Sequence, residues 1–118
     1  MSTIPKRTLG HTGLEVGTLG FGGAPLGDLF EEVSNECAQS TLQAAWDAGI
    51  RYYDTAPFYG YGKSEHRYGH FLRQQQRKDF VVSTKVGRVL TATRDLDNFD
   101  KGFWTGGLPF DYRFDYGY

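Results

Sequence analysis

Apolar residues recur every three or four positions between residues 34 and 48, at Ala38, Leu42, Ala45 and Trp46. This spacing is typical of a helix that buries one face. Ser34 precedes the run as a candidate N-cap, and Gly49 follows it where a left-handed residue ends many helices. The pattern therefore predicts a helix over residues 34–48.

A second pattern of this kind predicts a helix over residues 64–77, with Tyr68, Phe71 and Leu72 on one face. Four basic side chains belong to the same stretch, at Arg67, Arg73, Arg77 and Lys78. Because such a run is usually solvated, we expect these side chains to form the exposed face of the second helix.

Short apolar stretches bounded by glycine or charged residues predict strands over residues 17–23, 50–54 and 80–86. Before them, residues 7–9 and 14–16 flank a loop rich in turn formers and form a candidate hairpin. Strands that alternate with helices favour a parallel sheet. The predicted fold class is therefore α/β, in the order hairpin, strand, helix, strand, helix, strand.

The pattern changes towards the end of the chain. Residues 89–118 are rich in aromatic side chains, contain Gly106, Gly107 and Pro109, and show no clean periodicity. We interpret them as a long aromatic loop, in which Asp115 is placed like the N-cap of a helix that lies beyond the chain.

Composition and charge exclude several classes of protein. The 118 residues include 13 Lys and Arg against 14 Asp and Glu, which argues against nucleic acid or an anionic membrane surface as partners. No apolar run approaches the roughly 18 residues of a membrane span, and the first residues lack the apolar stretch of a signal peptide. With Cys37 as the single cysteine, we expect no internal disulfide and a cytoplasmic globular protein.

Asp54 and Lys85 are candidate chemical groups because both lie near the C-terminal ends of predicted parallel strands, where functional groups gather. The two-residue period of a strand places Ser83 and Lys85 on the same side. An ammonium group on an otherwise apolar strand requires an anion, and Asp54 on the preceding strand can supply it. Asp–Lys pairs of purely structural importance are also common.

Tyr59 lies five residues after Asp54, on a loop that can fold back over the strand ends. A phenol near an ammonium group ionises more readily, and it can then exchange a proton with a carbonyl oxygen or an alcohol. The three residues therefore suggest carbonyl–alcohol redox or proton-transfer chemistry, with a structural ion pair as the alternative.

These residues stand in motifs that resemble the aldo-keto reductase family. The motifs are AGIRYYDTAPFYG at residues 48–60, Ser64 and Glu65 followed by Gly69, VVSTK ending at Lys85, and RTLG and LGFG at residues 7–10 and 19–22. The resemblance, which covers residues 6 to about 88, implies Tyr59 as general acid/base, Lys85 as the group that promotes its ionisation, and Asp54 as the partner of Lys85. It also implies NAD or NADP as cofactor, near Gly22, Gly23, Ala24 and Asp54. A packing turn at a barrel strand is the alternative interpretation of the glycine-rich segment at residues 22–24.

The family fold is a (β/α)8 TIM barrel, which needs about 250 residues. The hairpin and about three βα units over residues 6–88 would be its N-terminal part, and we expect the 118 residues alone to be inactive. The family's catalytic His lies on a later strand, and His11, His66 and His70 are not in its context. The tail at residues 103–116 resembles the branch of D-threo-aldose (L-fucose) dehydrogenases and pyridoxal 4-dehydrogenase, which implies an aldehyde, sugar or pyridoxal-like substrate.

Other interpretations of the motifs fit less well. Lys63 follows a glycine as in a phosphate-binding loop, but Pro57 stands where that motif requires glycine. His66 and His70 have the spacing of metal ligands on a helix, but no third ligand accompanies them, so we predict no metal. A non-catalytic binding or assembly module derived from the family is the alternative function.

Overall fold

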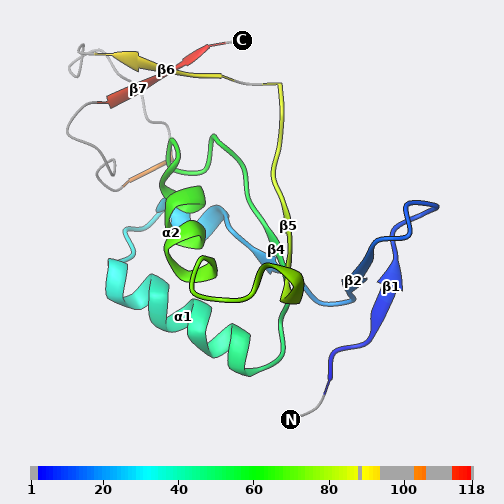
Figure 1. Cartoon of the computed structure of the whole chain (residues 1–118). Coiled ribbons are helices and arrows are strands. Elements are labelled where there is room, and N and C mark those ends of the chain that lie inside the picture. The colour runs from blue at the N-terminus through cyan, green and yellow to red at the C-terminus, as the bar shows by residue number, and fades with distance from the viewer. Residues whose placement is uncertain (1–2, 88, 94–102, 106–112, 118) are drawn as a thin grey trace.

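The computed structural model describes residues 3–87, 89–93, 103–105 and 113–117, and its centre is a three-stranded parallel sheet (Figure 1). The sheet contains β3 (Phe21–Gly22), β4 (Tyr52–Asp54) and β5 (Val81–Ser83) in that order. Helix α1 (Asn35–Asp47) connects β3 to β4, and helix α2 (Lys63–Leu72) connects β4 to β5. The predicted alternation of strands and helices is therefore confirmed.

Helix α1 begins and ends where the sequence predicts. The Ser34 side chain accepts a hydrogen bond from the Cys37 amide at 3.1 Å, which satisfies one of the unpaired donors of the first turn. Gly49 has a φ of +99°, a conformation that glycine adopts without a steric penalty. Its amide donates to the carbonyl of Trp46 at 2.9 Å, and this bond closes the helix.

The two faces of the sheet differ in chemistry because alternate residues of β4 point in opposite directions. Tyr53 is fully buried and packs between the helices, 6.5 Å from the ring of Trp46 in α1 and 5.6 Å from that of Tyr68 in α2. Tyr52 and Asp54 point to the other face and are half-buried. The helices therefore cover the apolar face and leave the polar face to the candidate site.

An antiparallel hairpin precedes the sheet, as predicted. Strand β1 (Lys6–Thr8) pairs with β2 (Glu15–Gly17), and the hairpin lies apart from the helices in Figure 1. Two short 3-10 helices complete this part of the fold. They are η1 (Ala24–Gly27) after β3 and η2 (Arg77–Asp79) before β5.

The second helix ends five residues earlier than the sequence predicts, at Leu72 rather than at residue 77. Leu72 is the last apolar side chain before Phe80 and belongs to the core. The polar residues after it have no apolar face to bury, and the amide of Gln75 instead bonds to the carbonyl of Leu72 in a tight turn. Packing, not helix propensity, therefore sets this boundary.

The long loop expected over residues 89–118 contains regular structure. Strand β6 (Val89–Thr93) pairs antiparallel with β7 (Arg113–Gly117), and Asp115 lies opposite Thr91 instead of capping a helix. Phe114 and Tyr116 alternate with Asp115, which is the two-residue period of a strand. Residues 94–102, 106–112 and 118 of the expected loop lie outside the described residues.

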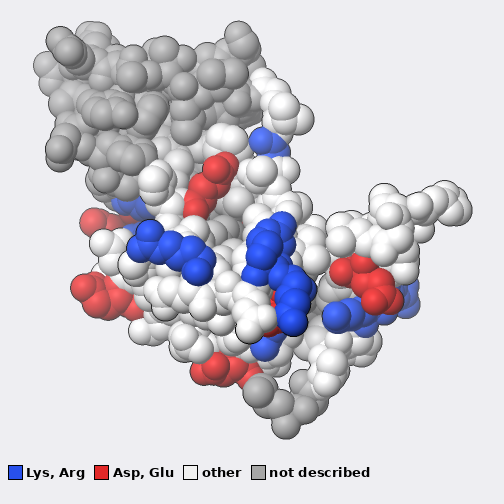
Figure 2. All heavy atoms as spheres, viewed as in Figure 1, with Lys and Arg blue, Asp and Glu red and all other residues white. Residues whose placement is uncertain are grey.

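The prediction that four basic side chains form the solvated face of the second helix is wrong for one of them, Arg67. Arg73, Arg77 and Lys78 are exposed, and Figure 2 shows basic side chains gathered over the middle of the viewed face. Arg67, in contrast, is only 7% exposed and turns into the protein. Its guanidinium group contacts Asp28, a residue to which the sequence patterns gave no role.

Candidate active site

The C-terminal ends of β4 and β5 bring Asp54, Ser83 and Lys85 together. Asp54 lies beside Ser83 in the parallel register, so both side chains point to the same face. The Ser83 hydroxyl donates to Oδ1 of Asp54 at 2.6 Å, and Nζ of Lys85 donates to Oδ2 at 3.0 Å. The predicted Asp54–Lys85 pair is therefore present, and a hydroxyl completes the carboxylate's contacts.

Lys85 is held at the mouth of the site by two acceptors. Its ammonium group also donates to the main-chain oxygen of Thr55 at 2.9 Å. The hydrogen bond to Asp54 raises the pKa of Lys85, and the neighbouring Tyr59 adds to this rise. Lys85 is therefore a stable cation, with half of its side chain open to solvent.

The Asp54 carboxylate is ionised for reasons that the contacts explain. Burial raises the pKa of Asp54, but the hydrogen bonds from Ser83 and Lys85 outweigh this effect and hold the pKa below its ordinary value. Because 41% of its side chain is exposed, the charge is only partly shielded from solvent. A fixed anion thus lies beside a fixed cation at the strand ends.

Tyr59 projects from the loop between β4 and α2, next to this pair. The ammonium group of Lys85 lies 4.9 Å from the centroid of the Tyr59 ring. The Tyr59 amide donates to Ala56 at 3.2 Å, and its carbonyl accepts from Ser64 at 3.1 Å. The backbone of Tyr59 is therefore fixed on both sides, and the half-buried phenol can exchange protons beside an ammonium group.

The loop is attached to the sheet through buried hydroxyl groups. Ser64, at the start of α2, is fully buried; its hydroxyl donates to the carbonyl of Gly23 at 2.7 Å and lies 2.8 Å from the hydroxyl of Thr55. The Thr55 amide donates to the carbonyl of Ser83 at 2.9 Å. These bonds connect the ends of β3, β4 and β5 to the loop that carries Tyr59.

Gly22, Gly23 and Ala24 lie at the end of β3, beside Asp54, where the sequence predicts the cofactor. A Cβ atom at Gly22 would meet nothing within 4 Å, and Gly22 is the register partner of Asp54. Open space on the face of Asp54 suits a flat ring such as nicotinamide. A Cβ at Gly23, in contrast, would lie 2.7 Å from the carbonyl oxygen of Asp54, so packing alone requires this glycine.

A second charged cluster, which the sequence patterns did not reveal, lies beneath the loop. Fully buried Asp28 accepts a hydrogen bond at Oδ1 from Arg67 at 3.0 Å and pairs at Oδ2 with Lys63. Burial raises the pKa of Asp28, but the bonds from Lys63, Val33 and Arg67 outweigh it and lower the pKa. Asp28 is 35 residues from Lys63 and 39 residues from Arg67 along the chain, so no local pattern connects it with its two partners on α2.

Gly27 places this cluster directly against the Tyr59 loop. A Cβ at Gly27 would lie 2.4 Å from the carbonyl carbon of Tyr59, and Gly60 on the loop has a φ of +68°. Two backbones therefore approach each other in a way that only glycine permits. The position of Tyr59 depends on the segment that Asp28 anchors.

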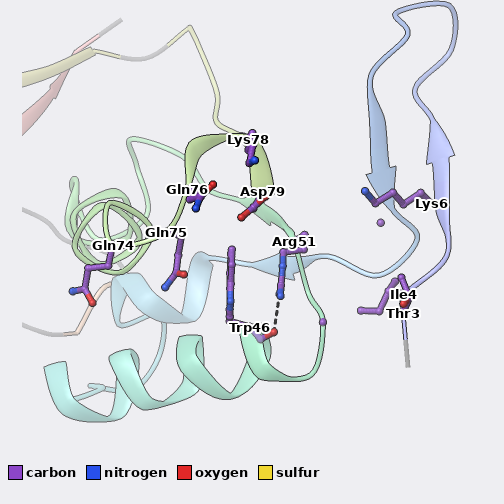
Figure 3. Close-up of a pocket in the computed structure, with 12 residues that line it drawn as sticks. Thr3, Ile4, Lys6, Trp46, Arg51, Gln74, Gln75, Gln76, Lys78 and Asp79 are labelled. Carbon is purple, nitrogen blue, oxygen red and sulfur yellow. Dashed lines mark hydrogen bonds between the residues drawn. The ribbon is translucent and has the colours of Figure 1, made fainter. Parts of the chain in front are cut away.

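The pocket in Figure 3 lies at the other end of the sheet. It has a volume of about 730 Å³ and is lined by Lys6 of the hairpin, Arg51 before β4 and Asp79 before β5, among others. Arg51 stacks over Trp46, with its guanidinium carbon 3.7 Å from the ring centroid. Asp54, Tyr59 and Lys85 are not among its lining residues, so this pocket is separate from the candidate active site.

Two further features concern metals and membranes. Within the described residues, no three His, Cys, Asp or Glu side chains gather as metal ligands would. The helices of the described part are too short or too polar to cross a bilayer.

Comparison with known proteins gives a consistent result. A sequence model described as "Aldo/keto reductase family" matches residues 18–112. The chain is similar to the pyridoxal 4-dehydrogenase of Microbacterium luteolum, with 49% identity over 122 aligned positions that cover 96% of this chain and 35% of the relative. It is similar to the D-threo-aldose 1-dehydrogenase of Pseudomonas sp, with 58% identity over 78 positions that cover 66% of this chain and 24% of the relative.

Solved structures agree with these sequence relatives. An aldo-keto reductase from Bacillus halodurans in its holo form matches 72% of this chain and 26% of its own, with 35% identity and a TM-score of 0.63. The glycerol dehydrogenase of Gluconobacter oxydans matches 78% of this chain and 28% of its own, with 26% identity and a TM-score of 0.59. These neighbours are TIM barrels, so the expected fold class, part of a (β/α)8 barrel, is confirmed.

Proposed function

The chain belongs to the aldo/keto reductase family, and from this premise we propose that it is part of an NAD(P)-dependent oxidoreductase that interconverts a carbonyl group and an alcohol. The resemblance to the branch of pyridoxal and D-threo-aldose dehydrogenases is confirmed. The single observation that carries the proposal is the placement of Tyr59, Lys85 and Asp54 at one sheet end: the ammonium group of Lys85 donates to the Asp54 carboxylate at 3.0 Å and lies 4.9 Å from the centroid of the Tyr59 ring.

In the proposed mechanism Tyr59 is the general acid/base. Its phenolic oxygen gives a proton to the carbonyl oxygen during reduction and takes one from the hydroxyl during oxidation. The fixed backbone of Tyr59 holds the ring in place, and its half-buried position leaves the phenol accessible to a substrate.

Lys85 and Asp54 prepare the tyrosine for this proton transfer. The ammonium group of Lys85 stabilises negative charge that develops on a nearby phenol oxygen. Asp54 keeps Lys85 protonated and in position, since it accepts from the ammonium group at 3.0 Å and raises the pKa of Lys85.

A bound nicotinamide cofactor would supply the hydride in its reduced form, NADH or NADPH, and would accept it in its oxidised form when an alcohol is oxidised. We propose that Gly22, Gly23, Ala24 and Asp54 lie at its nicotinamide end, because Gly22 leaves open space beside Asp54. One similar protein, a reductase of Schizosaccharomyces pombe, carries NADP(+) in its name.

The proposed substrate is a small aldehyde, a sugar hemiacetal or a pyridoxal-like compound. This class follows from the names of similar proteins, a pyridoxal 4-dehydrogenase, a D-threo-aldose 1-dehydrogenase and an L-galactose dehydrogenase of Arabidopsis thaliana. The partial exposure of Asp54 and Lys85 is compatible with a polar substrate.

The chain spans about a quarter to a third of the length of the curated relatives it matches. The described parallel sheet has three strands, whereas the family barrel has eight. His11 lies in the hairpin turn, and His66 and His70 are exposed residues of α2. We therefore propose that catalysis requires further strands and a His that they supply.

The test uses a fusion, called here the completed barrel, in which residues 1–87 replace the corresponding part of the D-threo-aldose 1-dehydrogenase. Turnover of NADH and NADPH is followed with a panel of aldehydes, aldoses and pyridoxal, beside the 118-residue chain and the unaltered relative. We expect turnover by the completed barrel and none by the 118-residue chain. A folded completed barrel without turnover, while the unaltered relative is active, contradicts the proposal.

One observation favours a second candidate function, a non-catalytic binding or assembly module. The chain is 36% identical over 86 positions to a putative voltage-gated potassium channel subunit beta of Schizosaccharomyces pombe. Under this alternative the completed barrel binds a nicotinamide nucleotide but transfers no hydride. The same assay, combined with nucleotide-induced thermal stabilisation, separates the two functions.

A further inference from the structure

The hydroxyl groups of Tyr52 and Ser83 lie close to the Asp54 carboxylate but take no part in the proposed proton transfer. Tyr52 stands two residues before Asp54 on β4, and Ser83 lies beside Asp54 on β5, so all three side chains occupy the polar face of the sheet. The Tyr52 and Ser83 hydroxyl oxygens are 3.1 Å apart, and Ser83 lies 2.6 Å from Oδ1 of Asp54. The hydroxyls thus form a line that ends at the carboxylate.

Each hydroxyl group carries a single hydrogen, and this determines which group is the donor in each of the two hydrogen bonds. An ionised carboxylate only accepts, so Ser83 must donate its single hydroxyl hydrogen to Asp54. The Ser83 oxygen can then only accept from Tyr52, which makes Tyr52 the donor of the 3.1 Å contact. The order of donation is Tyr52 to Ser83 to Asp54, and Lys85 donates to the other carboxylate oxygen.

We propose that Ser83 and Tyr52 are positioning residues for the proposed reaction, whose hydroxyls lock the Asp54 carboxylate in the orientation that holds Lys85 beside Tyr59. The inference deepens the proposed function and rests on it for its catalytic consequence. The locking itself is a property of the described residues and can be measured without turnover.

The bond from Ser83 matters because Lys85 contacts only one oxygen of the Asp54 carboxylate, Oδ2. With 41% of its side chain exposed, water competes for both oxygens, and a carboxylate held only by Lys85 can rotate about its last torsion. A second bond, to Oδ1, restricts that rotation. Charge-assisted bonds of this length are among the stronger ones in proteins.

Several other groups near Asp54 titrate or carry charge, and they belong to different elements. Lys85 follows β5, Tyr59 belongs to the loop after β4, and Tyr68 of α2 donates its hydroxyl to the main-chain oxygen of Asp54 at 3.1 Å. Glu65 of α2 accepts a hydrogen bond from Thr84, beside Lys85, at 3.1 Å. Among these groups only Lys85 donates to the carboxylate, so Ser83 is its one uncharged side-chain donor among the described residues.

The test is the pKa of the Asp54 carboxyl group in the 118-residue chain, measured by the NMR shift of its carboxyl carbon across a pH series. Ser83→Ala removes the donor, so we expect the Asp54 pKa to rise, because a lost bond to the charged form favours protonation. Tyr52→Phe should raise it less, since Ser83 still donates. Amide spectra of each variant show whether the fold is kept.

Two matched controls keep the interpretation specific. Thr84→Val removes the neighbouring hydroxyl, which contacts Glu65 and not Asp54, and Tyr53→Phe removes a hydroxyl that donates to Ile50 on the covered side of β4. Both should leave the Asp54 pKa unchanged. An unchanged Asp54 pKa in Ser83→Ala, or an equal rise in Thr84→Val, overturns the proposal.

The kinetic consequence is measured in the completed barrel. Ser83→Ala should lower kcat roughly tenfold with little change in KM, because a single hydrogen bond to a charged group is worth about that factor. The acid limb of the pH profile should move to higher pH, since Asp54 is protonated earlier, whereas Thr84→Val should leave the profile in place. A rise in the NMR pKa without any kinetic change would refute the catalytic consequence while leaving the locking intact. An unchanged NMR pKa refutes the locking whatever the activity.

Discussion

Asp28 and Asp54 are both carboxylates paired with a lysine, but they differ in nearly every other respect. The Asp28 side chain is fully buried and its partner Lys63 is 11% exposed, whereas the Asp54 and Lys85 side chains are 41% and 48% exposed. Asp28 also pairs with the buried Arg67, whereas Asp54 accepts from the hydroxyl of Ser83. One carboxylate is enclosed by cations, and the other stands at the mouth of the candidate site.

The difference in burial separates the carboxylate that supports the fold from the one that is available for chemistry. A buried ion pair holds its surroundings together because the loss of one partner leaves an uncompensated charge. An exposed pair stabilises the fold little, and its groups can respond to a substrate or cofactor. We therefore assign Asp28 to the scaffold and Asp54 to the site, with Gly27 and Gly60 as the contact between them.

The largest effect that separates the two carboxylates is on stability. Asp28→Ala should lower the free energy of unfolding by about 3–5 kcal/mol, because Lys63 and Arg67 are left buried without their anion. Asp54→Ala should cost at most about 1 kcal/mol, as for other exposed pairs. Urea unfolding of the two variants measures the difference, and equal costs would contradict the assignment.

A smaller effect tests the contact between the scaffold and the site. Gly27→Ala should lower stability by about 1–3 kcal/mol, because the added Cβ would lie 2.4 Å from the carbonyl carbon of Tyr59. In the completed barrel it should also lower kcat, since Tyr59 is displaced. Gly69→Ala is the matched control: its Cβ meets nothing within 4 Å, and alanine in a helix should be neutral or slightly stabilising. If Gly69→Ala lowered stability as much as Gly27→Ala does, the effect of Gly27→Ala would not come from its contact with Tyr59.

The smallest effect is on how the free energy of unfolding changes as the pH falls into the acid range. The pKa of Asp28 in the folded chain lies below its ordinary value of 3.8, so the unfolded chain binds the proton first as the pH falls. The stability that Asp28 contributes is therefore present above about pH 3.8 and is lost as the pH falls through the folded pKa. Asp28→Asn should flatten the loss of stability in this acid window more than Asp54→Asn does. Urea unfolding at a series of acidic pH values measures both slopes, and a steeper slope in Asp28→Asn is the contrary result.

Much of the fold follows from local sequence. Ser34 and Gly49 mark the ends of α1 because caps and left-handed glycines act within a few residues. Asp54 and Lys85 are 31 positions apart, but their pairing still follows from the sequence, because both lie near the ends of successive predicted strands and an unpaired ammonium group is costly.

The elements that were predicted wrongly depend on distant contacts. Arg67 is predicted as exposed because it belongs to a run of basic residues, yet its guanidinium group is buried against Asp28, 39 residues away. The pairing of β6 with β7 joins residues 20 to 28 positions apart, and Asp115 therefore lies in a strand rather than at a helix start. Local patterns describe an element's own preference, whereas these features are fixed by partners elsewhere in the fold.

Tyr59→Phe in the completed barrel separates the two roles, because the exposed cluster around Asp54 should perform proton transfer while the buried cluster around Asp28 holds the fold. This substitution removes only the hydroxyl group, and Tyr53→Phe, which removes a hydroxyl from the helix-covered face, is its control. We predict that kcat falls about 10²–10⁴-fold in Tyr59→Phe, with urea unfolding unchanged, and stays near the starting value in Tyr53→Phe. Turnover of Tyr59→Phe within about twofold of the unsubstituted completed barrel would contradict the assignment of Tyr59 as the general acid/base.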